Sequence, residues 1–415
     1  MRIVRGNKVT AEVARLRKRG AVGNPRAEAT SRRIVSSVRR GGDAALRRYA
    51  ERFDDLGKRQ ALEVSPAELK QAFQSVSPQF RAALEAAARN VRQFCEWQMP
   101  RPFTKEIQPG IAVGQVVRPL GSVGCYVPGG RYPLPSSLLM TVIPAQVAGV
   151  ERIVVASPRP APATLAAAAL LGVQNFLRVG GAQAIAALAY GTKTITSVDK
   201  IVGPGNSFVT AAKKLVAFDC AIDMLAGPTE VVIVADEGEP EFIAADLVAQ
   251  AEHDPEAMAV FITSSADLAG AVAAAVELSA RGNPVAQAAL RLRGTIFVAE
   301  SKAAALRLAD SLAPEHITVS REAVASVTCA GSIFVGDWSP QALGDYASGP
   351  NHVLPTGGAA RFRGGLSVMD FLKTISVQEV SRAGLKQIAP LVEILAGVEG
   401  LQAHAASVRT RCAHA

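Results

Sequence analysis

Four of the five histidines in this 415-residue chain stand among carboxylates and amides, and they are the first candidates for chemistry. They lie in the stretches QAEHDPE, APEHI, GDYASGPNHVLPT and GLQAHA, and they are His253, His316, His352 and His404. Histidine serves both as a zinc ligand and as a general base near neutral pH. These surroundings favour a shared site over unrelated structural roles. The fifth, His414, lies next to the C-terminus, where chains fray, and has no assigned role.

Gln250 and His253 could form half of a metal site or only the polar rim of a buried helix. They are three residues apart, so on a helix they would project from one face. Zinc accepts histidine nitrogen and carboxylate oxygen, and a catalytic zinc site keeps a position open for substrate. The spacing therefore nominates this pair together with a carboxylate such as Asp345.

Glu315 and His316 differ in kind from a chelating pair. They follow a proline and lead into the strand-like run ITVS, where adjacent side chains point in different directions. Diverging groups make a poor chelate but a plausible acid/base pair. The residues by themselves thus indicate a metal-assisted enzyme.

Composition excludes several classes of protein. A hydrophobic share of 49% with 20% charged residues is typical of a globular chain, and the length calls for more than one core. No apolar run reaches about 18 residues, which argues against a membrane span, and MRIVRGNKVT has no apolar signal core. Five scattered cysteines without a CxxC pair indicate a reduced, cytoplasmic protein.

The net charge of +9 is concentrated near the N-terminus. Residues 1–60 hold 17 Lys/Arg and 6 Asp/Glu, and the rest of the chain sums to −2. The arginines alternate with apolar residues at helical spacing, which is typical of a solvated helix face. A polyanion-binding arm is the alternative, but the distribution argues against a general nucleic-acid surface.

The first hundred residues have helical patterns, and an alternation of strands and helices follows. The strand-like runs are RIVVAS, NFLRVGG, DKIVGPG, EVVIVAD, MAVFITSS, GTIFVAE and GSIFVGD, between residues 152 and 337. Such alternation predicts parallel sheets covered by helices on both faces. We expect an α/β fold of two modules that break near IDMLAGPTE, and a helical tail that has no strand partner.

Three glycine-rich loops each follow a strand-like run and open a helix: YVPGGRYPLPSS, VGGAQA and VGPGNSF. Ligands in parallel α/β sheets bind beyond the carboxyl ends of the strands, and such loops present backbone N–H groups to phosphates. Phe208 stands where a dinucleotide fingerprint has its third glycine. Each loop could therefore bind phosphate or only make a tight turn.

In order along the chain, these stretches resemble the histidinol dehydrogenases, zinc- and NAD-dependent enzymes of histidine biosynthesis. The resemblance rests on YVPGG, GGAQAIAALAYGT, DKIVGPGN, IDMLAGPTEVVIVAD, QAEHDPEA, APEHI, LGDYASGPNHVLPT, GLSVMDFLK and EGLQAHAASVRTR. It covers nearly the whole chain, most loosely the first hundred residues. It implies the last step of the pathway, in which L-histidinol is oxidised through L-histidinaldehyde to L-histidine and two NAD⁺ are reduced.

The resemblance also implies roles for the matching residues. One Zn²⁺ per subunit would be bound by Gln250, His253, Asp345 and His404. His316 would accept the hydroxyl proton, and Glu315 would activate the water that adds to the aldehyde. The metal and acid/base residues would contact the substrate, together with Thr229, His352 and Glu399. The NAD⁺ contacts would be Tyr126, Gln183 and Asn206, in the three glycine loops.

The resemblance further implies a homodimer whose C-terminal tails, with Glu399 and His404, complete each other's active sites. The expected modules are Rossmann-like but lack a complete dinucleotide fold. We expect a basic helical N-terminal segment (1–20), a larger α/β domain with the metal and acid/base residues (21–125 plus 229–365), a Rossmann-like NAD-binding domain (126–228) and the exchanged helical tail (366–415).

Two positions depart from the family pattern, and two other functions compete. Thr229 stands where many relatives have serine, and Cys125 occupies a usually aliphatic position that we interpret as packing. One rival is a paralogous zinc- and NAD-dependent dehydrogenase of another small polar alcohol. Glu399 favours histidinol, because a carboxylate suits a cationic amine. The other rival is an inactive polyanion-binding protein that uses the basic N-terminal helices.

Overall fold

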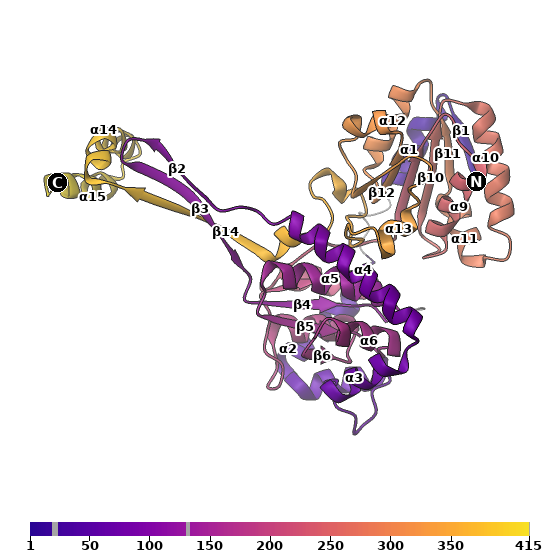
Figure 1. The fold of residues 1–415 in the computed structure, drawn as a ribbon, viewed down its shortest axis with the longest axis horizontal. Helices are drawn as coiled ribbons and strands as arrows, with labels where there is room; N and C mark the ends of the chain where they lie inside the picture. The colour runs from indigo at the N-terminus through magenta and orange to yellow at the C-terminus, as the bar shows by residue number, and fades with distance from the viewer. Residues whose placement is uncertain (19–23, 130–132, 415) are drawn as a thin grey trace.

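A computed structural model describes residues 1–18, 24–129 and 133–414, which form two α/β modules and a projecting arm (Figure 1). Both modules are parallel sheets covered by helices, so the predicted α/β class is confirmed. Each of the seven strand-like runs between residues 152 and 337 contains a strand.

The first module is a five-stranded parallel sheet between two helical layers. Its strand order is β6 (Asn175–Leu177), β5 (Arg152–Ala156), β4 (Ser122–Tyr126), β7 (Lys200–Val202) and β8 (Ala221–Ile222). Alternate residues of β4 serve opposite faces: Val123 and Cys125 belong to one apolar core and Tyr126 to the other. The first core is shared with α4 (Pro78–Trp97), α5 (Pro135–Ala148) and α6 (Pro162–Leu170), and the second with α2 (Pro25–Phe53), α7 (Gly181–Tyr190) and α8 (Ser207–Val216).

The second module is a six-stranded parallel sheet that also lies between two helical layers. Its order is β1 (Arg2–Arg5), β11 (Thr295–Val298), β10 (Met258–Thr263), β9 (Glu230–Val234), β12 (His316–Val319) and β13 (Ser332–Val335). One face is covered by α9 (Pro240–Ala251), α10 (Ala266–Ser279) and α11 (Pro284–Arg293), and the other by α1 (Lys8–Arg17) and α12 (Lys302–Leu312). The short helix α13 (Gln341–Tyr346) follows β13.

Two of the expected domain boundaries are wrong. The segment 1–20 was expected to be helical, but β1 within it pairs in parallel with β11 and forms one edge of the six-stranded sheet; residues 19–20 lie outside the described ranges. Helices α2, α3 (Pro66–Ser75) and α4 were expected to belong with residues 229–365. They pack on the five-stranded sheet instead, since their apolar faces share its two cores.

Local signals explain where these N-terminal helices begin. Asn24, Ser65 and Ser77 cap α2, α3 and α4, and each cap is followed by proline at the first helical position. A side-chain oxygen at the cap satisfies a backbone N–H that has no partner within the helix, and proline has no N–H to satisfy there.

The arm is an antiparallel sheet in the order β14 (Leu372–Val380), β3 (Ile111–Pro119) and β2 (Phe103–Gln108). It extends away from both modules and carries α14 (Arg382–Val398) and α15 (Gln402–Ala413) at its tip (Figure 1). The expectation that the tail has no strand partner is therefore wrong. Nine residues of the tail pair with β3 along its whole length.

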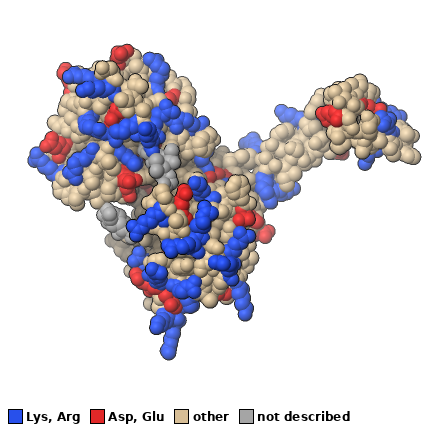
Figure 2. Space-filling view, turned by 180° about the vertical axis from the view of Figure 1, so that it is seen from behind, with Lys and Arg blue, Asp and Glu red and all other residues tan. Residues whose placement is uncertain are grey.

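The surface agrees with a solvated basic helix rather than with one continuous basic surface. On the face seen in Figure 2, acidic side chains lie among the basic ones on both modules. On α2, Arg47 pairs with Glu51, and Arg39 lies over the Tyr190 ring. All five cysteines are free thiols, and no helix in the described ranges is long and apolar enough to cross a membrane.

Candidate active site

The acid/base candidates lie at the amino ends of two neighbouring parallel strands. Glu315 precedes β12, whose first residue is His316, and Thr229 precedes β9. Because β9 and β12 pair in parallel, these residues meet at one edge of the six-stranded sheet. This edge differs from the expectation, since ligands of open α/β sheets ordinarily bind beyond the carboxyl ends of the strands.

Glu315 is a buried carboxylate held by two hydrogen bonds. Its Oε2 accepts from Thr229 Oγ1 at 2.6 Å and from the Glu230 backbone N–H at 2.8 Å. Gln250 Nε2 donates to the same Thr229 hydroxyl. Burial raises the pKa of Glu315 to about 7 in spite of the two hydrogen bonds. Near neutral pH this group can therefore both take up and release a proton.

His316 is equally buried, and its contacts identify the nitrogen that can act as a base. Its Nδ1 lies 3.1 Å from the Glu230 carbonyl oxygen, which can only accept, so Nδ1 carries a proton. The other nitrogen, Nε2, lies 3.7 Å from Asp345 Oδ1 and is the nitrogen that can gain or lose a proton. Burial opposes the charged imidazole, but the carboxylates of Glu315 and Asp345 outweigh it and raise the pKa of His316.

His352 connects this edge to the other module. Its Nδ1 donates to the Asp345 carbonyl oxygen at 2.7 Å, and its Nε2 lies 3.2 Å from Ser137 Oγ. Burial lowers the pKa of His352, so the neutral ring accepts from the serine hydroxyl. Ser137 lies in the first turn of α5, the helix that follows β4. It is a residue that sequence reasoning missed, although the quoted loop YVPGGRYPLPSS contains it.

Three of the four expected metal ligands, Gln250, His253 and Asp345, come together near this edge. Burial alone would raise the pKa of Asp345, but the neighbouring imidazoles, with His316 first and then His352 and His253, lower it below its usual value. Because His253 contributes to lowering the pKa of Asp345, its ring must lie close enough to interact electrostatically with this carboxylate. Gln250 is buried and donates through its amide nitrogen to Thr229, so its carbonyl oxygen is the atom available to a cation.

The expectation that Gln250 and His253 share a helix is wrong. Helix α9 ends at Ala251, and His253 lies in the turn beyond it. Pro255 explains the end of the helix, because the residue before a proline is disfavoured in the helical conformation. The pair lies at the end of α9 and in the following turn rather than along one helical face.

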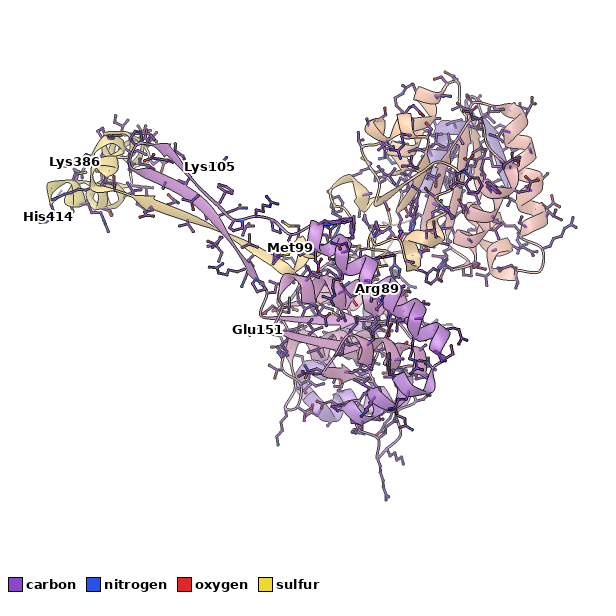
Figure 3. The ribbon with its side chains drawn as sticks, in the orientation of Figure 1. Arg89, Met99, Lys105, Glu151, Lys386 and His414 are labelled. Atoms are coloured by element: carbon purple, nitrogen blue, oxygen red, sulfur yellow. The ribbon has the colours of Figure 1, made fainter. Side chains whose placement is uncertain are left out.

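Glu399 and His404 are not brought to this edge within one chain. Glu399 caps the end of α14, and His404 lies in the first turn of α15. Figure 3 places Lys386 of α14 and His414, which follows α15, at the far end of the arm. Accordingly, among residues 1–18, 24–129 and 133–414 of a single chain, no group of three His, Cys, Asp or Glu side chains could hold a metal ion. The amide, imidazole and carboxylate donors that gather suit zinc but need a further ligand.

The expected dinucleotide contacts lie together at the carboxyl edge of the five-stranded sheet. Tyr126 ends β4, Gln183 lies in the first turn of α7, and Asn206 caps α8 after β7. The Tyr126 hydroxyl accepts from the Gly181 N–H at 3.1 Å. Because β5 and β7 flank β4 on opposite sides, Tyr126 lies at a topological switch point, where open α/β sheets bind ligands. Residues 130–132 of the first glycine loop lie outside the described ranges.

Asp54 is a second residue that sequence reasoning missed. It lies at the end of α2 and accepts from the Gly180 N–H and from Gln183 Nε2, both at 3.0 Å. Burial raises the pKa of this carboxyl above its usual value. Its position far earlier in the chain left no local signal that it holds the second glycine loop.

Cys125 has the packing role expected of it. Its side chain is fully buried in the first core, and burial raises the pKa of the thiol to about 12. It is therefore a neutral thiol at physiological pH rather than a reactive thiolate.

His352 joins the glycine-loop edge of one α/β module to the buried acid/base pair of the other. This arrangement suits an NAD-dependent oxidoreductase, and the comparisons with known proteins show that the chain belongs to this class. The model of the family described as histidinol dehydrogenase matches residues 17–412. The chain is 48% identical to histidinol dehydrogenase of Methanothermobacter thermautotrophicus, over 91% of this chain and 92% of that protein. It is 45% identical to the Aquifex aeolicus enzyme, over 97% of each.

A solved structure agrees with these matches. The crystal structure of histidinol dehydrogenase from Elizabethkingia anophelis matches with a TM-score of 0.94 at 34% identity, over 99% of this chain and 98% of that one. The chain belongs to the histidinol dehydrogenase family.

Proposed function

We propose that this chain oxidises L-histidinol through L-histidinaldehyde to L-histidine, the last step of histidine biosynthesis, with two NAD⁺ and one Zn²⁺ per subunit. The observation that supports this most is the line of contacts from His316 through Asp345 and His352 to Ser137. It joins the acid/base edge to the helix that follows β4. Hydride transfer needs the substrate and the cofactor held together, and this line of contacts supports a single site that would hold both.

In the first oxidation, His316 takes the proton of the substrate hydroxyl. Its Nε2 is the base, because Nδ1 is committed to the Glu230 carbonyl oxygen. A bound Zn²⁺ would supply a template that orients the substrate, and a bound NAD⁺ would supply the hydride acceptor. Asp345 lies on the Nε2 side of the ring, 3.7 Å from that nitrogen, and its carboxylate stabilises the imidazolium that forms when Nε2 takes the proton.

In the second oxidation, Glu315 removes a proton from the water that adds to the aldehyde. Its Oε2 is occupied by Thr229 and Glu230, so Oε1 is the oxygen that serves the water. A pKa of about 7 makes it a stronger base than an ordinary carboxylate. A buried site that serves both steps also keeps the reactive aldehyde from escaping.

Substrate and metal would be held by residues from two chains. Gln250, His253 and Asp345 would bind Zn²⁺ together with His404 of the partner subunit. Besides the metal and acid/base residues, the substrate contacts are Thr229, His352 and Glu399 of the partner subunit. A carboxylate at position 399 suits the cationic amine of histidinol better than it would suit an anionic alcohol.

Tyr126, Gln183 and Asn206 line the NAD⁺ site. Five free thiols support a cytoplasmic location.

The arm supports a homodimer with shared sites. Helix α14 exposes an apolar stripe at helical spacing, formed by Leu391, Ile394, Leu395 and Val398, with exposed fractions between 55% and 84%. Such a stripe on a soluble helix normally packs against another surface. A second copy of the chain would cover the stripe and receive Glu399 and His404 at its own incomplete edge.

The test is to count NADH per histidinol consumed, with and without a chelator. We expect two NADH per histidine formed and loss of turnover after chelation. One NADH with accumulated aldehyde would exclude the two-step single site. Turnover of another small alcohol but not histidinol would favour the paralogous dehydrogenase. Salt-sensitive DNA binding without NAD⁺ reduction would favour the polyanion-binding protein.

A further inference from the structure

Lys213 and Asp223 form a buried ion pair beneath the loop that ends at Asn206. Their side chains are 2% and 0% exposed. Lys213 belongs to α8, the helix that Asn206 caps, and Asp223 follows β8. Two charges removed from water are tolerated only where further hydrogen bonds satisfy them. The hydrogen-bond partners of the two side chains therefore show which part of the backbone the pair holds.

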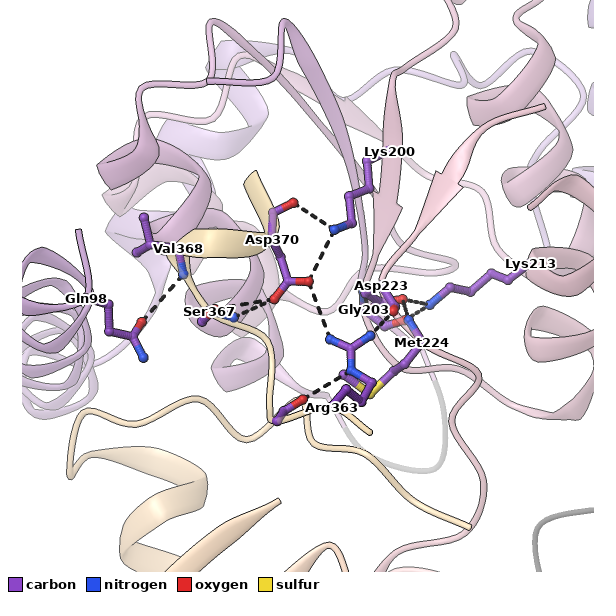
Figure 4. A network of polar contacts seen from close by, with 11 residues as sticks. Gln98, Lys200, Gly203, Lys213, Asp223, Met224, Arg363, Ser367, Val368 and Asp370 are labelled. Carbon is purple, nitrogen blue, oxygen red and sulfur yellow. Dashed lines mark hydrogen bonds and ion pairs between the residues drawn. The ribbon is translucent and has the colours of Figure 1, made fainter. Parts of the chain in front are cut away.

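The pair encloses a single residue of the loop, Gly203. Lys213 Nζ donates to the Gly203 carbonyl oxygen at 3.0 Å, and the Gly203 N–H donates to Asp223 Oδ2 at 2.7 Å (Figure 4). The two peptide groups that flank this glycine are thus held by the two members of one ion pair. The contacts close a ring that joins the end of β7, the loop and α8.

At Gly203 this loop packs against Tyr126, which ends β4 and begins the first glycine loop. Its φ is +111°, and a Cβ there would lie 2.1 Å from the Tyr126 carbonyl oxygen. The position thus requires glycine. Fixing the peptides of Gly203 also fixes the spacing between Tyr126 and Asn206, two of the proposed NAD⁺ contacts.

A second layer anchors Asp223. The Arg363 guanidinium donates to the Asp223 carbonyl oxygen and pairs with Asp370 at 3.4 Å (Figure 4). Lys200 Nζ binds the Asp370 carboxylate at 3.2 Å and its carbonyl oxygen at 2.7 Å. Since Lys200 begins β7, the strand that leads to Gly203, the network holds both ends of the segment it supports.

We propose that Lys213 and Asp223 are positioning residues for the dinucleotide, which hold the peptides of Gly203 so that the loop fits NAD⁺. The inference rests on the proposed function, in which NAD⁺ binds at this loop. Neither side chain is exposed to a ligand, so both act through the loop and neither is catalytic. Their loss should weaken cofactor binding and leave histidinol binding unchanged.

The test uses the double variant Lys213→Met/Asp223→Asn in the zinc-loaded dimer. Removing one partner alone would leave a buried unpaired charge and risk unfolding, whereas the double variant removes both charges. The introduced asparagine still accepts from the Gly203 N–H, but the introduced methionine offers no donor to the Gly203 carbonyl. The matched control is Lys214→Met, which changes the adjacent lysine, a surface residue paired with Glu28.

We expect the Kd for NADH, measured by fluorescence titration, to rise about tenfold in the double variant, which corresponds to one charge-assisted hydrogen bond. The KM for histidinol and kcat at saturating NAD⁺ should stay within about twofold of the control. Amide hydrogen exchange at residues 203–208 should accelerate, whereas the control should match the wild type.

Should the double variant fail to fold, Arg363→Gln provides a second test. Its side chain is 20% exposed, and the change removes the donor to the Asp223 carbonyl. We expect about a threefold rise in the Kd for NADH. Unchanged NADH affinity and loop exchange in these variants, beside a wild type that binds NADH, would overturn the inference and leave the proposed function standing. A wild type that binds no NADH would overturn both.

Discussion

Replacing Glu315 with glutamine should stabilise the metal-free protein at alkaline pH. Glutamine keeps an oxygen that can accept from Thr229 and Glu230, but it cannot ionise. Burial raises the pKa of Glu315 from 4.5 to about 7 in the folded state. Ionisation is thus easier in the unfolded chain, so the wild type loses stability as pH rises above 4.5, and the loss is complete above 7.

The expected gain follows from this shift. One pKa unit corresponds to about 1.4 kcal/mol, so Glu315→Gln should gain about 3 kcal/mol in unfolding free energy at pH 8 and less than about 1 kcal/mol at pH 5. Urea denaturation of the chelator-treated protein at the two pH values measures this. Glu300→Gln, which changes an exposed carboxylate, is the matched control.

The same variant should lose the second oxidation more than the first. A general base contributes about 10²- to 10⁴-fold, and only the histidinaldehyde step needs an activated water. In the wild type, the rate of that step should rise with pH through an ionisation near 7, and this rise should be absent from the variant. Equal losses with histidinol and with histidinaldehyde, or a stability gain that does not depend on pH, would refute the assignment of Glu315.

Two further predictions concern His316 and the arm. His316→Asn should slow histidinol oxidation by about 10²- to 10⁴-fold and histidinaldehyde oxidation by less. Separate assays with the two substrates would measure this. A rate of histidinol oxidation within about tenfold of the wild type would exclude the role of His316 as base. The variants His253→Asn and His404→Ala should each be inactive alone and should recover about one quarter of wild-type activity when they are refolded together. About half of the dimers would then contain one chain of each variant, and each such heterodimer would have one intact site of its two. His414→Ala refolded with His253→Asn gives the dilution control, about one half, and inactive but demonstrated heterodimers would contradict the exchange.

Local patterns in the sequence suffice for most of the two modules. Runs such as EVVIVAD and MAVFITSS are rich in β-branched and apolar residues and therefore predict buried strands. Each of the two runs contains a buried strand. The glycine loops lie after strands of the five-stranded sheet, as their flanking patterns predict. Cys125 is buried, as its apolar surroundings imply.

Where the expectations failed, the deciding interactions are non-local. β14 pairs with β3, which lies far earlier in the chain, and nothing within LKTISVQEV specifies that partner. Helices α2 to α4 are amphipathic, but an amphipathic face does not reveal which of two sheets it covers. The end of α9 before His253 is a different failure, because Pro255 was a visible signal.

The sequence by itself determined which residue types are present for chemistry: the histidines, Glu315, Asp345 and the glycine loops, each recognisable from a few neighbours. Only the tertiary structure decided how they meet. It placed the acid/base pair at the amino edge of one sheet and the glycine loops after strands of another. It also placed α14 and α15, with Glu399 at the end of α14 and His404 in α15, at the tip of an arm. It also supplied Asp54, Ser137 and the Lys213–Asp223 pair. Such contacts arise when distant segments bury apolar faces together, and the side-chain environments that set proton affinities form only then.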